Sequence, residues 1–171
     1  MLVQVLTTLS TLLALALCSP SAELSPSSAF SPYFVVADFE AFRAAPAYPE
    51  MHSRAVFNLT LVHPDPAQRW STMCLAHMAS DLCNTTDYLR CEPVGDAAHA
   101  DERLRFKFSA NLDSVEIMRL WTYQGMHMKT TASEGTYWNK DGKDANVTES
   151  QYGQLYKRPA EWVFAWRSTV G

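Results

Sequence analysis

The sequence predicts an all-β protein: an antiparallel β-barrel or sandwich of short strands, in a single domain. Short segments alternate apolar and polar residues, most clearly where Leu104, Phe106 and Phe108 alternate with basic residues. This alternation places one face of a strand in a core. β-Branched and aromatic residues fill these segments, and turn-forming residues separate them. No convincing long helix interrupts the pattern, which favours a sandwich or barrel.

Length and composition agree with one packed domain. The chain has 171 residues, and without a leader it can still bury about two-thirds of its unfolded surface in one core. Its 47% hydrophobic and 12% aromatic content is that of a globule. The net charge of −4 is too small to indicate a nucleic-acid partner.

Residues 1–22 are predicted to be a signal peptide. They carry no charged side chain, and an apolar run at 12–18 ends in small residues and Pro20. Cleavage after Cys18 or after Ala22 fits this pattern. The run is too short to span a bilayer, and no later stretch is long and apolar enough for a membrane helix. No membrane partner is therefore expected after leader removal.

The folded domain is expected at 33–171, after a flexible arm at 23–32 that is rich in serine and proline. Three glycosylation sequons lie in the domain, at Asn58, Asn84 and Asn146. Glycans and disulfides are both made in the eukaryotic secretory route. Together with the leader, the sequons predict a secreted, extracellular glycoprotein.

Two strands are predicted at the start of the domain. Residues 33–42 are dense in β-branched and aromatic side chains, and the segment stops before Pro46. In residues 55–62, apolar side chains alternate with Asn58 and Thr60. The alternation places the glycosylation site on the outer face of its strand.

Further strands are expected in the middle of the chain. Residues 70–78 favour a strand that leads into a loop, although Leu75, Met78 and Leu82 also recur at helical spacing. Residues 103–108 form the clearest half-buried strand. A hairpin turn at residues 109–114 then leads to a strand at 115–123.

The last third of the chain is less regular. Residues 126–138 are interpreted as one or two weaker strands, interrupted at 133–135. Residues 134–159 are polar and rich in turn formers, and a loop of this length is usually functional or disordered. A final strand at 161–167 carries three large aromatic side chains on one face, Trp162, Phe164 and Trp166.

Three cysteines remain after leader removal, namely Cys74, Cys83 and Cys91. An odd number permits one intrachain bridge and leaves one thiol, so three pairings are open. A bridge from Cys74 to Cys91 closes the longest interval and would stabilise by roughly 3 kcal/mol. The alternative is a metal site with Cys74, His77, Cys83 and Cys91 as ligands, but an oxidising compartment and the lack of a Cys-X-X-Cys knuckle disfavour it. No metal and no cofactor is expected.

Residues 33–42 and 56–61, and the cysteines Cys74 and Cys91 followed by the strand at 104–108, resemble in order and spacing the Alternaria major-allergen family of small secreted fungal proteins. The resemblance implies an antiparallel β-barrel with a sandwich-like cross-section and without enzymatic activity. Members of that family are allergens and elicitors or effectors of plant immunity. The resemblance also implies a disulfide between Cys74 and Cys91.

The chain departs from the family pattern in two ways. It lacks the cysteines of the family's second bridge, and residues 23–73 lack the cysteine that links protomers. A dimer of the family kind is therefore not expected. Cys83 is an addition to the pattern, and it is interpreted as a free or intermolecular thiol.

No catalytic site is predicted. The five histidines stand in no recognisable nucleophile motif. Asp38 and Glu40 share one strand face, but carboxylates on an exposed strand are usually only solvated. The sequence therefore predicts that the protein is not an enzyme, with a secreted hydrolase as the least favoured alternative.

Two groups of residues are candidates for partner binding. Arg103, Arg105 and Lys107 form a basic stripe that suits an acidic partner or a cell-wall polysaccharide, although a solubilising outer face is the more ordinary explanation. The predicted loop 134–159 has the aromatic and basic mixture that interfaces favour, although a flexible glycosylated loop would show it too. Its candidate residues are Tyr137, Trp138, Tyr152, Tyr156, Lys157 and Arg158.

The functional expectation follows from these features. The sequence predicts a secreted fungal binding protein, an effector, elicitor or allergen-like protein that recognises a host extracellular protein. The alternative is an extracellular carrier of a small apolar or aromatic ligand, held in a barrel mouth. The aromatic residues that would line that mouth are Trp121, Trp138, Trp162, Phe164 and Trp166.

Overall fold

The computed structural model describes residues 31–79, 81–84, 87–93, 95, 99, 102–138 and 145–171. The predicted signal peptide lies outside the described residues, and so does the predicted arm apart from its last two residues. The first strand begins at Tyr33, where the folded domain was expected to begin.

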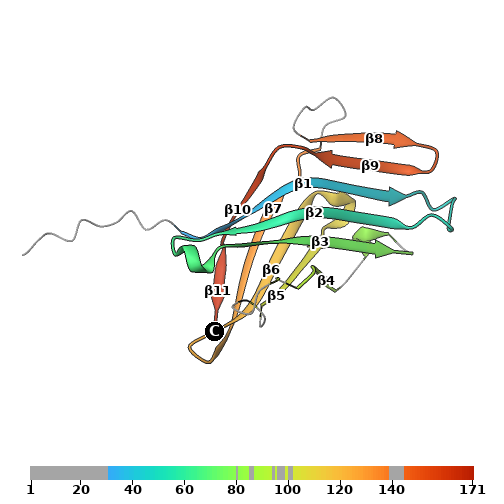
Figure 1. Cartoon of the computed structure of the whole chain (residues 1–171). Helices are drawn as coiled ribbons and strands as arrows, with labels where there is room; N and C mark the ends of the chain where they lie inside the picture. Colours follow the sequence, from blue (N-terminus) through green and yellow to red (C-terminus); the bar gives the residue numbers. More distant parts are fainter. Residues whose placement is uncertain are drawn as a thin grey trace, which may run out of the picture.

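Two antiparallel sheets make up the fold (Figure 1). Sheet A has the order β3-β2-β1-β9-β8, and β10 also pairs with β1. Its strands are β1 (Tyr33–Ala44), β2 (Ser53–Val62), β3 (Trp70–Met78), β8 (Asn146–Ser150), β9 (Gly153–Arg158) and β10 (Trp162–Ala165). Sheet B has the order β11-β7-β6-β5-β4. Its strands are β4 (Leu89–Arg90), β5 (Arg103–Phe108), β6 (Ser114–Tyr123), β7 (Met126–Gly135) and β11 (Ser168–Val170).

Short 3₁₀ turns connect several strands, at Pro66–Gln68, Leu82–Asn84 and Ala110–Leu112. In Figure 1 the strands of sheet B run steeply across those of sheet A. None of the helical segments in the described residues is long and apolar enough to cross a membrane.

The core lies between the two sheets and is built by the predicted alternation. Burial alternates along most of β2, so that Phe57 and its apolar neighbours at alternate positions face inward. Phe57 meets Phe106 of sheet B edge-on at 4.9 Å between ring centroids. Phe39 packs against Phe57 at 5.7 Å and against Phe108 at 6.0 Å. Such aromatic pairs add about 0.5 to 1.5 kcal/mol each to the free energy gained by burial.

The sandwich prediction is confirmed, but the barrel expectation is wrong, because the described strands form two sheets and not one closed sheet. In the described part of the chain, links on two sides join the sheets. The chain passes directly from β10, on β1 in sheet A, to β11, on β7 in sheet B. On the other side, a disulfide joins Cys74 of β3 to Cys91, which follows β4.

The disulfide therefore clamps an edge strand of each sheet. The Cys91 amide donates to the Leu104 carbonyl of sheet B, and the Glu92 amide donates to the Met73 carbonyl of sheet A, each at 3.0 Å. The bridge that the family resemblance implies is confirmed, and Cys83 is a free thiol. The alternative metal site is wrong, because two of its four ligands are joined to each other.

β1 pairs with β2 along one edge and with two strands, β10 and β9, along the other edge. A backbone irregularity in β1 separates the part that pairs with β10 from the part that pairs with β9. Its register with β2 shifts between Ala37 and Glu40, and Asp38 has a φ of 53°. The first part of β1 pairs with β10 and the second part pairs with β9. The shift bends the strand, which lets β10 leave sheet A toward sheet B.

Two strand predictions are confirmed and a third is corrected. Residues 70–78 form β3, so the helical alternative there is wrong. The hairpin turn at 109–114 and the strand after it are present. In the segment that follows, the predicted interruption at 133–135 is wrong, because these residues form the end of a single strand, β7.

Two other expectations are corrected. The predicted loop 134–159 contains an antiparallel hairpin of β8 and β9. β8 is an edge strand with mostly exposed side chains, so the hydrophobic alternation that reveals a strand is weak there. The predicted strand 161–167 ends at Ala165, because the chain changes sheets after β10.

Candidate binding sites

The predicted basic stripe lies on the outer face of sheet B. Leu104, Phe106 and Phe108 face the core, which directs the alternate side chains of β5 outward. Residues that are directly opposite in neighbouring strands share a face, so the pairing register extends the stripe across the sheet. Arg90 lies opposite Arg105. Leu120 lies between Arg103 and Lys129.

We call this surface the basic face. On its strands it carries five cations and one carboxylate: Arg90, Arg103, Arg105, Lys107, Lys129 and Glu116. Lys107 pairs with Glu116 at 3.2 Å. In the described part of the chain, no carboxylate pairs with the other four cations. The basic face is thus opposite in sign to the chain as a whole, which carries −4.

Lys107 and Glu116 stabilise each other's charged forms. The hydrogen bond and charge of Glu116 raise the pKa of Lys107. Burial alone would raise the pKa of Glu116, but hydrogen bonds from Tyr88 and Lys107 outweigh burial, and the pKa is lowered. Lys107 Nζ also lies 4.7 Å from the centroid of the Tyr88 ring. This pair is engaged within the protein, whereas the neighbouring Arg103 and Arg105 have no carboxylate partner among the described residues.

A groove of about 450 Å³ lies at the β6–β7 end of the basic face. Its lining includes Arg103 and Lys129, which flank Leu120, together with Thr122 and His127. The β6–β7 turn beyond it uses positive φ angles at Gln124 and Gly125, as a two-residue hairpin requires. The groove therefore offers cations and hydrogen-bond donors beside a tight hairpin turn.

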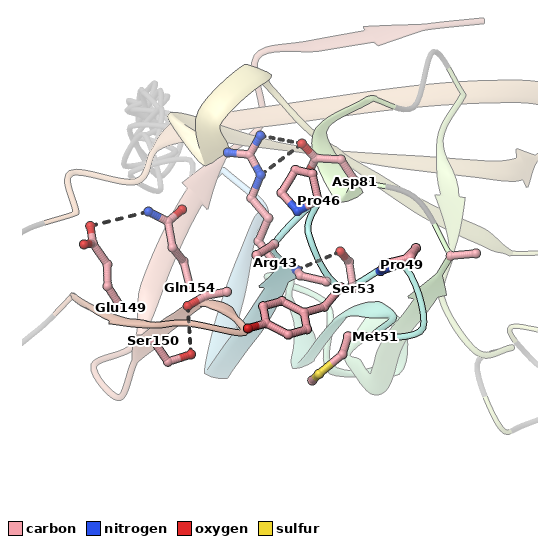
Figure 2. A pocket seen from close by; sticks show the side chains of 14 residues that line it. Arg43, Pro46, Pro49, Met51, Ser53, Asp81, Glu149, Ser150 and Gln154 are labelled. Carbon is pink, nitrogen blue, oxygen red and sulfur yellow. Dashed lines mark hydrogen bonds and ion pairs between the residues drawn. The ribbon is translucent and has the colours of Figure 1, made fainter.

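A larger cleft, of about 600 Å³, lies at one end of sheet A, between the turn after β1 and the β8–β9 hairpin (Figure 2). Arg43 reaches toward Asp81 and donates to its carboxylate through Nε at 2.9 Å and also through Nη2. On the other side, Gln154 donates to Glu149 at 3.5 Å. Ser53 accepts from the Ala44 amide at 3.1 Å.

The close approach of two strands shapes this cleft. A Cβ atom on Gly153 would lie 2.1 Å from the Arg43 carbonyl oxygen, and Gly153 has a φ of 149°. Only glycine fits this position. Nearby, the rings of Tyr48 and Tyr152 meet edge-on at 5.1 Å. The charged and polar side chains in this cleft already bond within the protein, so the cleft supplies shape more than free hydrogen-bonding capacity.

The Arg43–Asp81 pair gives a testable pH dependence. Burial on its own would raise the pKa of Asp81. Hydrogen bonds from Arg43 and from the Cys83 amide, together with the charge of Arg43, lower the pKa by more than burial raises it, so the net shift is downward from 3.8. A carboxyl group whose pKa is lowered by folding stabilises the fold at pH values above its unfolded-state pKa. This stabilisation is lost as the pH falls through the folded-state pKa.

Asp81→Asn is therefore expected to lower the free energy of unfolding by about 1 kcal/mol at pH 7, and by less below about pH 4. Chemical denaturation of both proteins across this pH range measures the difference. A difference that stays constant down to pH 2 would contradict the expected linkage.

The six candidate residues of the predicted loop do not gather on one surface. Tyr137 is 81% exposed, whereas Tyr156 is buried. Trp138 packs against Phe39 at 5.7 Å and donates to the Leu112 carbonyl at 3.0 Å. The others have separate partners: Tyr152 contacts Tyr48, Lys157 pairs with Glu40 and Arg158 stacks on Trp162.

The aromatic residues considered for a ligand-binding barrel mouth mostly pack inside the protein. Trp162 and Phe164 are buried in the core, with their rings 4.7 Å apart. Trp138 packs against the same core. These side chains fill the sandwich in place of lining an open mouth.

The glycosylation sequons lie on different elements. Asn58 is exposed on β2, as the alternation predicted, and its amide donates to Asp38 at 3.0 Å. Asn146 begins β8 and is half-buried. Asn84 ends a 3₁₀ turn, and the other two residues of its sequon lie outside the described residues.

Sequence reasoning missed a buried charged cluster. Arg119 is the largest fully buried side chain among the described residues, with 1% of it exposed. It donates to Glu102 through Nε at 3.0 Å and through Nη2. His99 Nδ1 lies 3.0 Å from the same carboxylate. Arg119 follows Val115 and Ile117 on the inward face of β6, so an arginine at a core position was the available signal.

Three tryptophans surround the Arg119 guanidinium. Its Cζ atom lies 4.3 Å from the Trp121 ring centroid and 5.9 Å from the centroids of Trp70 and Trp166. Burial lowers the pKa of Arg119, and the hydrogen bond and charge of Glu102 oppose this effect. We call these three tryptophans with Arg119, Glu102 and His99 the arginine cluster.

Within the described residues, no group of three or more histidine, cysteine or acidic side chains could hold a metal ion. Comparisons with protein-family models, with curated proteins and with solved structures find no match to this chain.

Proposed function

We propose that this chain is a secreted fungal protein that binds an acidic surface of a host extracellular protein through the basic face. The observation that carries this proposal is the charge asymmetry. The strands of this sheet face carry five cations and one carboxylate, although the chain as a whole has a net charge of −4.

The chemistry of the basic face suits protein recognition. Arginine presents several donors in a planar fork and is weakly hydrated, which favours contacts with carboxylates at interfaces. Leu120 lies opposite Arg103 and is half-buried, so it adds some apolar surface beside the cations. Apolar surface next to arginine is typical of protein interfaces.

Electrostatic attraction would guide the encounter. A surface of one sign raises the association rate with a partner of opposite sign, and ionic strength weakens the effect. At physiological salt the Debye length is about 8 Å, so the attraction acts mainly over short distances. Association should therefore be salt-sensitive.

Other features support an extracellular role of this kind. The Cys74–Cys91 disulfide is typical of proteins that fold in an oxidising compartment. The leader and the three sequons support secretion. The resemblance to the Alternaria major-allergen family supports an effector, elicitor or allergen-like role without enzymatic activity.

Charge reversal on the basic face tests the proposal. The double variant Arg103→Glu/Arg105→Glu is expected to weaken binding to a partner captured from host extracellular fluid by about tenfold or more. The matched control is Arg54→Glu/Arg69→Glu, which makes the same charge change at two exposed arginines, in β2 and just before β3, and leaves Lys157 paired with Glu40. This control should bind as the parent protein does.

The partner must then be purified and measured alone, at two salt concentrations. Substituting lysine for an acidic residue of the partner should restore affinity for the charge-reversed protein. Equal binding by both double variants, or a basic partner surface, would refute the proposal.

A further inference from the structure

The arginine cluster holds an excess of unmet hydrogen-bond donors. Among the described residues, five buried side-chain nitrogens have no acceptor, and three of them belong to this cluster. They are Arg119 Nη1, Trp70 Nε1 and Trp166 Nε1. An unmet buried donor costs about 1 to 3 kcal/mol. Of these three residues, only Arg119 also lines a cavity from which an acceptor could approach.

A cavity of about 230 Å³ borders the cluster. Arg119 and Glu102 lie at its buried side, and Trp121 forms part of its wall. Tyr123 and Gln68 also line it, and Tyr123 is 46% exposed. The rings of Trp121 and Tyr123 are 5.9 Å apart at an angle of 55°. The cavity thus combines an aromatic wall with amide, carboxylate and guanidinium groups.

The charges of the cluster indicate which kind of ligand fits. Arg119 already shares its charge with Glu102 through two hydrogen bonds. An anionic ligand would have to approach the Glu102 carboxylate, which repels it. A neutral ligand with oxygen acceptors avoids this repulsion, and its hydroxyl groups can also donate to Glu102 and Gln68.

From this arrangement we propose that the cavity binds one neutral sugar ring of a glycan. A pyranose has an apolar C–H face that can lie on Trp121 and Tyr123, and a rim of hydroxyls that both donate and accept. Arg119 is part of the cavity lining, but its Nη1 is covered, so a sugar oxygen would reach that donor only through a small shift of the neighbouring side chains. The small volume suits a single ring better than a drug-sized ligand.

Tryptophan fluorescence provides the direct test, because three of the five tryptophans lie in the cluster. The full chain is titrated with methyl β-glucopyranoside and, in parallel, with the matching methyl β-glucuronide, in which a carboxylate replaces the hydroxymethyl group. We expect a saturable change with the neutral sugar, with a Kd on the order of 1 mM, and weaker binding of the glucuronide.

Two exposed tyrosines make a matched pair of variants. Tyr123→Ala removes part of the aromatic wall and should weaken sugar binding by about fivefold. Tyr152→Ala removes a tyrosine of similar exposure, 44% against 46%, away from the cavity, and should leave binding unchanged. Gln68→Ala probes the polar rim independently and should also weaken binding.

Each other outcome overturns the proposal. A flat titration with the neutral sugar removes the ligand class. Tighter binding of the glucuronide shows an anion site in its place. Equal losses in Tyr123→Ala and Tyr152→Ala place the sugar outside this cavity. This test is independent of the proposed function, because the variants at Tyr123, Tyr152 and Gln68 leave the cations of the basic face unchanged.

Discussion

Arg119→Met is expected to lower the free energy of unfolding by about 3 to 5 kcal/mol, the largest effect we expect from a single substitution. Methionine keeps much of the side-chain volume but removes the cation. The Glu102 carboxylate, only 8% exposed, then loses both guanidinium hydrogen bonds. A buried carboxylate without its partner cation costs far more than the pair itself contributes. Urea denaturation followed by fluorescence measures the loss.

A double-mutant cycle separates the pair from simple loss of packing. Glu102→Leu removes the carboxylate, so Arg119→Met/Glu102→Leu leaves neither charge unpaired. The double variant should therefore be destabilised by about 1 to 3 kcal/mol less than the two single effects added together. Additivity within about 0.5 kcal/mol would contradict the coupling.

An exposed ion pair gives the matched control for this cycle. Arg54 lies 3.5 Å from Glu40, and its side chain is 56% exposed. Arg54→Met should change the unfolding free energy by less than about 1 kcal/mol, because solvent screens exposed pairs. Comparable losses at Arg54 and Arg119 would indicate that burial does not govern the effect.

Removing the disulfide is the second large effect. Cys74→Ser/Cys91→Ser is expected to lower the free energy of unfolding by about 2 to 5 kcal/mol. The bridge closes a sequence interval of 17 residues, for which loss of unfolded-state entropy corresponds to about 3 kcal/mol. Chemical denaturation of the variant, and of the parent protein with and without reductant, measures the loss.

The position of the bridge adds a structural consequence. It joins β3, at the edge of sheet A, to the segment after β4, at the edge of sheet B. Without it, β3 can separate from residues 91–93, and a free strand edge is prone to pair with another chain. We therefore expect the variant to aggregate more readily during unfolding, which light scattering detects.

Cys83 provides the control for the disulfide. It is a half-buried free thiol, and burial raises its pKa. Cys83→Ser should change stability by less than about 1 kcal/mol and should leave the Cys74–Cys91 bridge intact in non-reducing peptide mapping. Loss of the native bridge in this variant would mean that Cys83 takes part in the pairing.

Much of the secondary structure was predictable because burial on one face leaves a period of two in the sequence. β2 and β5 show this clearly, with apolar residues such as Phe57 and Phe106 facing the core. The β8–β9 hairpin was not predictable in this way. β8 is an edge strand with few buried side chains, so it carries little of the pattern that reveals a strand.

The candidate binding surfaces were also predictable only where they depend on alternation within one strand. The alternation in β5 was sufficient to place Arg103, Arg105 and Lys107 on one outer face. The sequence could not add Arg90 and Lys129, because strand pairing brings them there from other segments. Nor could it separate Tyr137, which is exposed, from Tyr156, which is buried, within one polar stretch.

By itself, the sequence determined that this protein is built from alternating strands, since side-chain alternation is a local property of each segment. Only the tertiary structure decided that the strands form two separate sheets, and that Arg119 meets Glu102 and three tryptophans. Those contacts join residues far apart in the chain. Their geometry depends on register and on how the sheets cross, which no single segment encodes.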